Sequence, residues 1–191
     1  MYSDHGTGWY NGQNGQPLED FYANQTPRFR WRLQTKGAVP DSKSKNYLEQ
    51  TQVLADYVKN QVFRGQSLPG EYETALEELE AQKAAIADLM TEYLPNNEPN
   101  PNYDWQEATK RLVKLQLNKM TRRTIPEAQY STITNLAVKG ERQLEDTYDW
   151  TISCSSDGAL VRVGSFGSGG ARVLNWDPVS SYSSIGVVLS R

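Results

Sequence analysis

The sequence is poor in the residues that most often build metal centres and disulfides. Its 191 residues include one cysteine, Cys154, and one histidine, His5. A single cysteine excludes an internal disulfide and a cysteine-based metal cluster, and a single histidine excludes a site that needs two imidazoles. No base or cation near Cys154 in the sequence would activate it, so a buried, inert thiol is expected. We therefore predict no catalytic residue, no metal and no cofactor.

The glycine-rich stretch GSFGSGGAR, residues 164–172, also falls short of a phosphate-binding loop. It lacks the lysine followed by serine or threonine, and no helix pattern follows Arg172. A turn between two strands is the better interpretation. Without a catalytic signature, the sequence favours a protein that is not an enzyme.

Long apolar runs and a net positive charge are absent too. No run approaches the ~20 residues of a membrane-spanning helix, and the N-terminus lacks the basic start and apolar centre of a secretory signal. The formal net charge is −3 and the mean hydropathy is −0.71, as in a polar, acidic chain. We expect synthesis in the cytoplasm without a signal peptide and no membrane insertion, and any basic site has to be local.

What is present begins with an extended region over residues 1–40. Residues 1–27 mix Gly, Asn, Gln and Ser with aromatic side chains, a composition that cannot close a core by itself. Trp9, Tyr10, Phe21 and Tyr22 are therefore candidate anchors on a neighbouring subunit. Strict alternation then predicts a strand over residues 28–34. Arg28, Arg30 and Arg32 would form its outward row, with Phe29, Trp31 and Leu33 facing a core or an interface.

Residues 41–149 carry a helical pattern, with apolar residues recurring at intervals of three and four. Gly65, the proline-rich stretch 95–103 and the capping residues Asp104 and Thr124 separate the predicted helices. We predict helices over residues 42–64, 69–94, 104–123 and 126–147. The stretch YSTITNLAV, residues 130–138, is also compatible with a strand.

Two successive predicted helices carry opposite charge. Residues 71–98 contain eight acids and one lysine, whereas the next helix contains six bases and two acids. The bases are Lys110, Arg111, Lys114, Lys119, Arg122 and Arg123. They would either track phosphate groups or lie beside the acidic helix, and the overall acidity favours the second interpretation.

Beyond residue 149 the pattern changes to short β-like runs separated by turn residues. DWTISC, ALVRV, ARVLNW and SIGVVLS predict a small antiparallel unit over residues 150–191 that has to pack on the helices, on the arginine strand or on another subunit. Its few charges and its aromatic residues, Trp176 and Tyr182 among them, suit a surface that meets protein or sugar. The predicted fold class is α+β: an extended N-terminal arm and one strand, a three- to four-helix bundle and this β unit.

These features together predict a non-enzymatic structural or connector subunit of a large homo-oligomeric assembly, most concretely a phage virion component of the neck, tail or capsid accessory type. Its partners would be copies of itself and other subunits. One alternative is a recognition module that binds glycan or protein through the C-terminal β unit. The other is a nucleic-acid-binding protein that uses the basic helix 104–123. The interface candidates are Trp9, Tyr10, Phe21, Tyr22, Arg28, Arg30, Arg32, Lys110, Arg111, Lys114, Arg122, Arg123, Trp176 and Tyr182.

Overall fold

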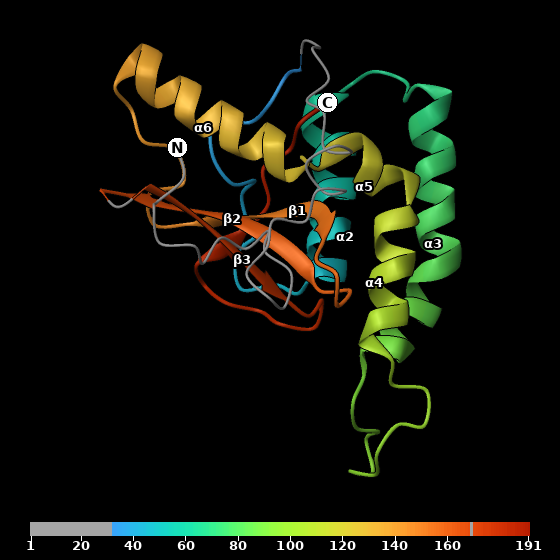
Figure 1. Ribbon diagram of the computed structural model, residues 1–191. Coiled ribbons are helices and arrows are strands. Elements are labelled where there is room, and N and C mark those ends of the chain that lie inside the picture. Colours follow the sequence, from blue (N-terminus) through green and yellow to red (C-terminus); the bar gives the residue numbers. More distant parts are fainter. Residues whose placement is uncertain (1–31, 169) are drawn as a thin grey trace. The chain divides into compact units, whose positions relative to one another are not determined.

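The computed structural model describes residues 32–168 and 170–191, and these form an α+β structure, as the sequence predicts (Figure 1). The helical elements are α2 (Tyr47–Tyr57), the π-helical turn Val58–Val62, α3 (Gly70–Met90), α4 (Trp105–Lys114), α5 (Gln116–Thr121) and α6 (Ile125–Lys139). In this part of the chain no helix is both long and apolar enough to cross a membrane.

The helix boundaries follow local capping chemistry. Asn46 and Glu49 form a capping box that begins α2, and Asp104 caps α4 by accepting from the Glu107 N–H. α6 begins with a second capping box, between Thr124 and Glu127, and covers the stretch for which a strand was the alternative. The helix predicted over residues 42–64 therefore begins at Tyr47.

The predicted helix 104–123 is interrupted. Leu115 is buried and adopts an extended ψ of 129°, which ends α4, and the Glu78 carboxylate accepts from the Gln116 N–H at 2.7 Å where α5 begins. α6 ends at Lys139 rather than near residue 147, because Gly140 takes the left-handed conformation with φ +70°.

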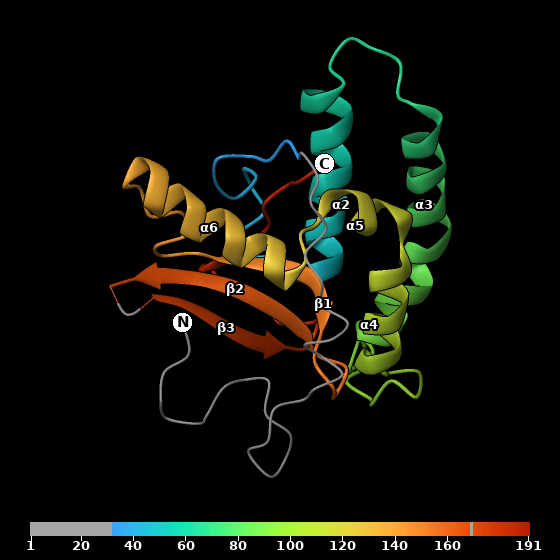
Figure 2. The same cartoon turned by 45° about the horizontal axis from the view of Figure 1, so that its top comes forward.

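The acidic α3 and the basic α4 lie side by side, connected by residues 91–104 (Figure 2). Apolar packing joins them, since Leu79 and Ile86 of α3 and Leu112 of α4 belong to one buried core. In the described part of the chain, the ion pairs of these helices are internal to each helix, such as Lys83–Glu80 and Arg111–Glu107. Apolar packing, rather than ion pairing between oppositely charged side chains, is therefore the main interaction between the two helices.

The sheet contains β1 (Tyr148–Cys154), β2 (Leu160–Gly167), β3 (Gly170–Trp176) and β4 (Ile185–Gly186), in the order β3-β2-β1-β4. β1, β2 and β3 pair antiparallel, but β4 pairs parallel to β1. The predicted purely antiparallel unit is thus not confirmed. The reason is that residues 177–184 carry the chain past two strands to the opposite edge of the sheet.

Each face of the sheet is covered by different helices. α6 lies on β1 and β2 on one face, where Ile125 and Ala128 pack against Val161 and Val163. On the other face, Trp150 joins the core that is shared with α2, α3, α4 and α5. A three- to four-helix bundle is therefore not confirmed, because α6 packs on the sheet.

The segment of residues 33–39 completes the edge of the sheet beside the C-terminus. Its backbone exchanges hydrogen bonds with residues 187–191, including Thr35 N–H to Leu189 O at 2.9 Å. The expected alternation is reversed where the structure describes it: Leu33 is 69% exposed, whereas the Arg32 side chain is largely buried and bonds Glu127 at 3.1 Å. Arg32 is buried because it forms an ion pair with Glu127, which belongs to the helix that covers this face, α6.

Gly164 provides a test of the register between β1 and β2. A Cβ atom at this position would overlap the Thr147 carbonyl and lie 2.6 Å from Tyr148 Cα. We expect Gly164→Ala to lower the free energy of unfolding by more than about 3 kcal/mol in urea titrations, because backbone atoms have to move. Gly167→Ala is the control, since its Cβ would meet no atom within 4 Å. Equal stability of the two variants would contradict this register.

Candidate functional site

The six bases predicted to form one basic surface are divided between the surface and the interior. Lys110, Lys114 and Lys119 are exposed. Arg122 and Arg123 are only 1% and 2% exposed. This burial corrects the prediction that these two arginines contribute to an interface or contact phosphates, because a partner cannot reach them in the folded chain.

Arg122 is surrounded by neutral acceptors and an aromatic ring. Its Cζ lies 3.6 Å from the centroid of the Tyr47 ring, a cation–π contact that is strengthened by burial. Burial lowers the pKa of Arg122 and raises the pKa of Tyr47, since each charged form is poorly solvated there. The guanidinium donates to Asn118 Oδ1, Trp150 O, Tyr47 O, Thr51 Oγ1 and Gln50 Oε1 at 2.9–3.4 Å.

Arg123 has a carboxylate partner. Its Nε and Nη2 donate to Asp149 Oδ2 at 2.9 and 2.7 Å, and Asp149 Oδ1 accepts from the Val188 N–H at 2.7 Å. Arg123 Nη1 also donates to Ser131 Oγ on α6 at 2.6 Å. One buried ion pair therefore joins β1, α6 and the C-terminal segment.

Sequence reasoning missed this buried network because the two arginines extend a run of exposed bases. The signal that was present is Asp149, an acid at the start of an otherwise uncharged strand, since a buried acid requires a partner. The consequence is functional as well as structural. Two of the six bases that were predicted to contact phosphate groups are not on the surface. A third, Arg111, is already paired with Glu107 at 3.1 Å.

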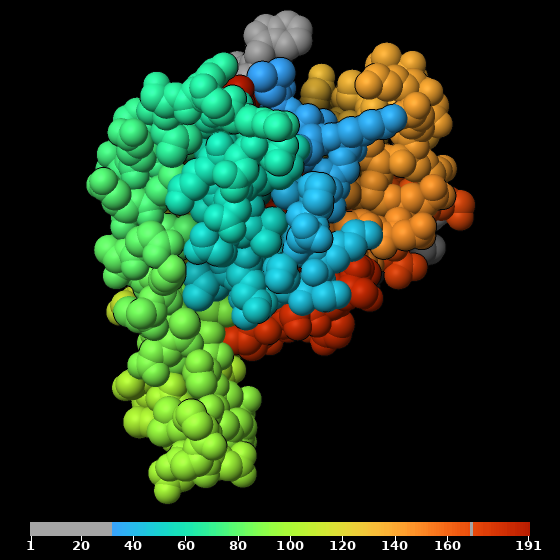
Figure 3. Space-filling model, turned by 180° about the vertical axis from the view of Figure 1, so that it is seen from behind, coloured from blue at the N-terminus to red at the C-terminus, as the bar shows by residue number. Residues whose placement is uncertain are grey.

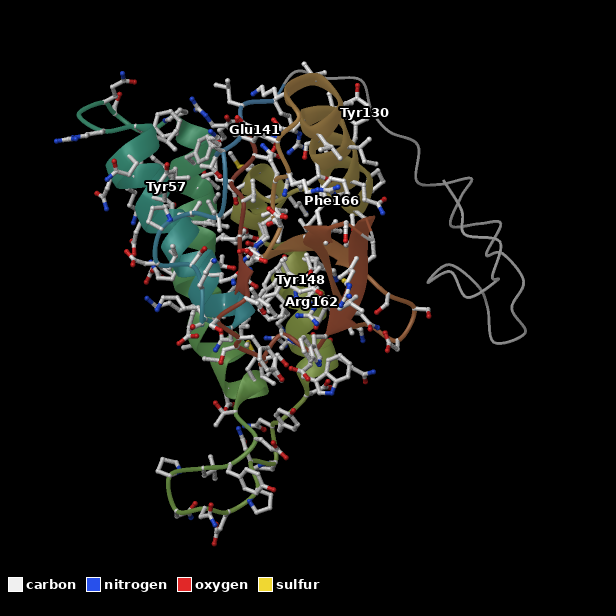
Figure 4. The ribbon with its side chains drawn as sticks, turned by 90° about the vertical axis from the view of Figure 1, so that its left-hand side faces the viewer. Tyr57, Tyr130, Glu141, Tyr148, Arg162 and Phe166 are labelled. Atoms are coloured by element: carbon white, nitrogen blue, oxygen red, sulfur yellow. The ribbon has the colours of Figure 1, made fainter. Side chains whose placement is uncertain are left out.

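A second cluster lies on the sheet face that points toward α2 and α4. Trp176 of β3 stacks on Tyr182 with a centroid distance of 4.4 Å and an interplanar angle of 17°. Arg162 of β2 lies 3.7 Å from the Trp176 ring centroid and 4.3 Å from that of Tyr148 (Figure 4). Trp176 and Tyr182 were predicted, whereas Arg162 and Tyr148 were not, since only the sheet register brings them together. We call these four residues the aromatic column.

A third feature is the outward face of α6. Tyr130, Ile133 and Val138 are 71%, 56% and 75% exposed, and Ala137 between them is also exposed. At 100° per residue these side chains share one half of the helix circumference. In Figure 4, Tyr130 lies on the side of α6 that faces away from the sheet. We call these four residues the α6 stripe.

The other residues and motifs considered in the sequence add no further candidate site in the described part of the chain. Trp9, Tyr10, Phe21, Tyr22, Arg28, Arg30 and His5 lie outside the described residues. In the glycine-rich stretch, residues 164–167 end β2 and residues 170–172 begin β3, and the two strands pair antiparallel. Within residues 32–168 and 170–191, no group of three or more His, Cys, Asp and Glu side chains is arranged to hold a metal ion.

Replacement of a buried arginine and of an exposed base from the same run should separate their roles. We expect Arg123→Gln to lower the free energy of unfolding by about 3–5 kcal/mol, because Asp149 is left as an uncompensated buried charge. Lys119→Gln should change it by less than about 0.5 kcal/mol. Urea titration followed by circular dichroism measures both. Similar small losses would show that the Arg123–Asp149 pair is not a main support of the fold.

Cys154 is an exposed residue at the end of β1, which corrects the expected burial, yet its thiol is not activated. Neighbouring atoms desolvate it and raise its pKa to about 11. Since the thiolate is the nucleophile, alkylation by iodoacetamide at pH 8 should be slower than that of free cysteine by about an order of magnitude. The rate should rise with pH until the pH approaches the thiol pKa. A rate that is already at its plateau at pH 8 would exclude this assignment.

Comparisons with known proteins give no family to which the chain can be assigned. No protein-family model, no curated protein and no solved structure matches the sequence or the fold. The features that carry functional information are therefore the chain's own exposed side chains. Among the described residues these are above all the α6 stripe and Tyr182, the exposed end of the aromatic column.

Proposed function

We propose that the chain is a non-enzymatic structural subunit of a homo-oligomeric assembly and that its copies meet at the α6 stripe. The observation that carries this proposal is the reversed polarity of α6. The face toward the sheet carries one large apolar residue, Ile125, at the start of the helix, and continues with Ala128, Thr132 and Asn135, which are small or polar. The face toward solvent carries three large side chains, Tyr130, Ile133 and Val138, each of which is mainly exposed.

A helix that only covers a sheet places its large apolar residues inward, because their burial supplies most of its stability. Burial of a Val or Ile side chain contributes about 1.5–3 kcal/mol. For Tyr130, Ile133 and Val138 most of this contribution is unused within the chain, since each side chain is more than half exposed. Contiguous exposed apolar residues are typical of a surface that another protein covers.

A second copy of the chain suits this surface. Between Glu127 and Lys139 α6 has no charged residue, so two copies can place their stripes together without like-charge repulsion. Tyr130 at the N-terminal end of the stripe offers an aromatic anchor of the type enriched in interfaces. A two-fold pairing of α6 with α6 would bury the same side chains on both subunits.

The loop of residues 91–103 offers a second contact surface for a larger assembly. It extends beyond the ends of α3 and α4, in the yellow-green part of Figure 3. Hydrogen bonds fix the conformation of this loop. The Asn100 side chain donates to Asp88 O, Asp88 Oδ1 and Thr91 O at 2.9–3.1 Å where the loop meets α3. Within the loop, the Leu94 N–H donates to Glu98 O. Tyr93 is 55% exposed on this loop. A loop with a defined conformation loses little entropy when it binds.

The most concrete version of this proposal is a phage virion component of the neck, tail or capsid accessory type, made in the cytoplasm and incorporated into the particle. Its support is the combination of an N-terminal sequence rich in aromatic residues, an apolar helix face and the lack of a catalytic signature in the sequence. Recognition of glycan or protein through the C-terminal β unit is the second candidate. It is favoured by the 45% exposure of Tyr182 in the aromatic column.

Native mass measurement with matched variants tests the α6 contact. We expect the wild-type chain to be oligomeric in multi-angle light scattering. Ile133→Glu should raise the dissociation constant of the oligomer at least tenfold, because it places a charge in an apolar interface. Ala85→Glu, at an exposed position of α3, is the control and should leave the mass unchanged. A wild-type monomer, or equal effects of both substitutions, would overturn the proposal.

A further inference from the structure

The guanidinium of Arg162 lies between two aromatic side chains that come from opposite sides. The strand order places β1 on one side of β2 and β3 on the other, so Tyr148 and Trp176 approach Arg162 from different strands. The residue is 6% exposed. Burial lowers its pKa, because a charged guanidinium is poorly solvated there. The two rings stabilise the cation through its faces but accept no hydrogen bond in its plane.

Arg162 also has no acceptor in the described part of the chain. Its Nε is buried without a hydrogen-bond partner, and no hydrogen bond or ion pair of the described residues involves its guanidinium. The other two buried arginines are satisfied, Arg122 by neutral acceptors and Arg123 by Asp149. Buried donors without acceptors are rare and cost free energy. Among the described residues, Arg32 Nε and Trp150 Nε1 are also buried without an acceptor, but the Arg32 guanidinium bonds Glu127 and the Trp150 indole carries no charge. Arg162 is thus a buried cation whose guanidinium has no acceptor, which points to a missing partner.

The kind of partner follows from the geometry of the open edge. Nε is the enclosed nitrogen, and the two Nη nitrogens are not among the fully buried unsatisfied atoms, so the in-plane edge is the accessible part. An oxyanion matches such an edge, because two oxygens can accept two parallel N–H bonds from a guanidinium. Cation–π stacking fixes the plane in which those donors point.

Exposed side chains at one end of the aromatic column are available to contact the rest of a ligand. Tyr182 stacks on Trp176 and remains 45% exposed, so one end of the aromatic column reaches the surface. Ser181 and Ser183, its neighbours in the chain, are exposed as well. An aromatic ring flanked by hydroxyls suits a small polar group with an apolar face, such as a sugar ring.

We propose that the aromatic column is a binding site for a small oxyanion ligand, in which Arg162 takes a carboxylate or phosphate group and Tyr182 contacts the group that carries it. This site is separate from the α6 stripe. The oxyanion could belong to an acidic sugar or to a phosphate-bearing ligand, and titration can distinguish these two kinds of ligand.

Arginine-selective ¹H–¹⁵N spectra of the full chain give a direct measurement, with Arg162→Met used to assign the Arg162 Nε–H signal. The probes are sodium D-glucuronate, inorganic phosphate and uncharged D-glucose at matched ionic strength. We expect a saturable shift of the Arg162 signal with an oxyanion at millimolar concentration and none with glucose. The Arg32 Nε–H is the internal control, since it is also buried without an acceptor but its guanidinium bonds Glu127.

The outcomes separate the two sources. Stronger binding of glucuronate than of phosphate, weakened roughly fivefold by Tyr182→Ala, supports an acidic sugar. Stronger binding of phosphate supports a phosphate-bearing ligand. The absence of a saturable shift with either anion, or equal shifts of Arg32 and Arg162, overturns the proposal. The Ile133→Glu variant should bind like the wild type, so failure of this site and failure of the α6 contact are distinguishable.

Discussion

The burial of two consecutive arginines is the constraint on which the rest of the structure depends. Arg122 and Arg123 stand between α5 and α6, where the chain passes from the helical layer to the sheet. Arg122 donates mainly to groups of α2, and Arg123 to Asp149 of β1 and Ser131 of α6. Because an unpaired buried cation is costly, these acceptors have to be in place together. The helices and the sheet are thereby held in one arrangement.

Because the interior pairs these two arginines so completely, groups that are left unpaired or uncovered are informative. The chain satisfies Arg122 and Arg123 fully, yet it leaves the edge of Arg162 without an acceptor and the apolar face of α6 around Ile133 without a cover. In natural proteins, functional sites are among the places where buried polar groups are left unpaired or local rules are broken. The two departures differ in kind, since one is a guanidinium edge without an acceptor and the other is an exposed apolar surface. A subunit that is built into an assembly and also carries a small ligand would account for both.

Periodicity predicted much of the fold and little of the candidate sites. Apolar spacing marked α3 and α6, and the β-like runs coincide with β1, β2 and β3, because each pattern reflects burial along a single element. The break at Leu115 was not predictable, since its cause is the carboxylate of Glu78 in another helix. The same holds for β4, whose parallel pairing depends on where residues 177–184 carry the chain.

The sequence by itself determined the α+β class, the polar and acidic character, and the limits that one cysteine and one histidine set on chemistry. Only the tertiary structure decided the roles of the arginines. Arg32, Arg122, Arg123 and Arg162 have the same side chain, yet one bonds an acid on α6, two lie in the interior and one stacks between aromatic rings. The physical reason is that local sequence sets which face of an element is apolar, whereas the fate of a charge depends on which distant groups surround it.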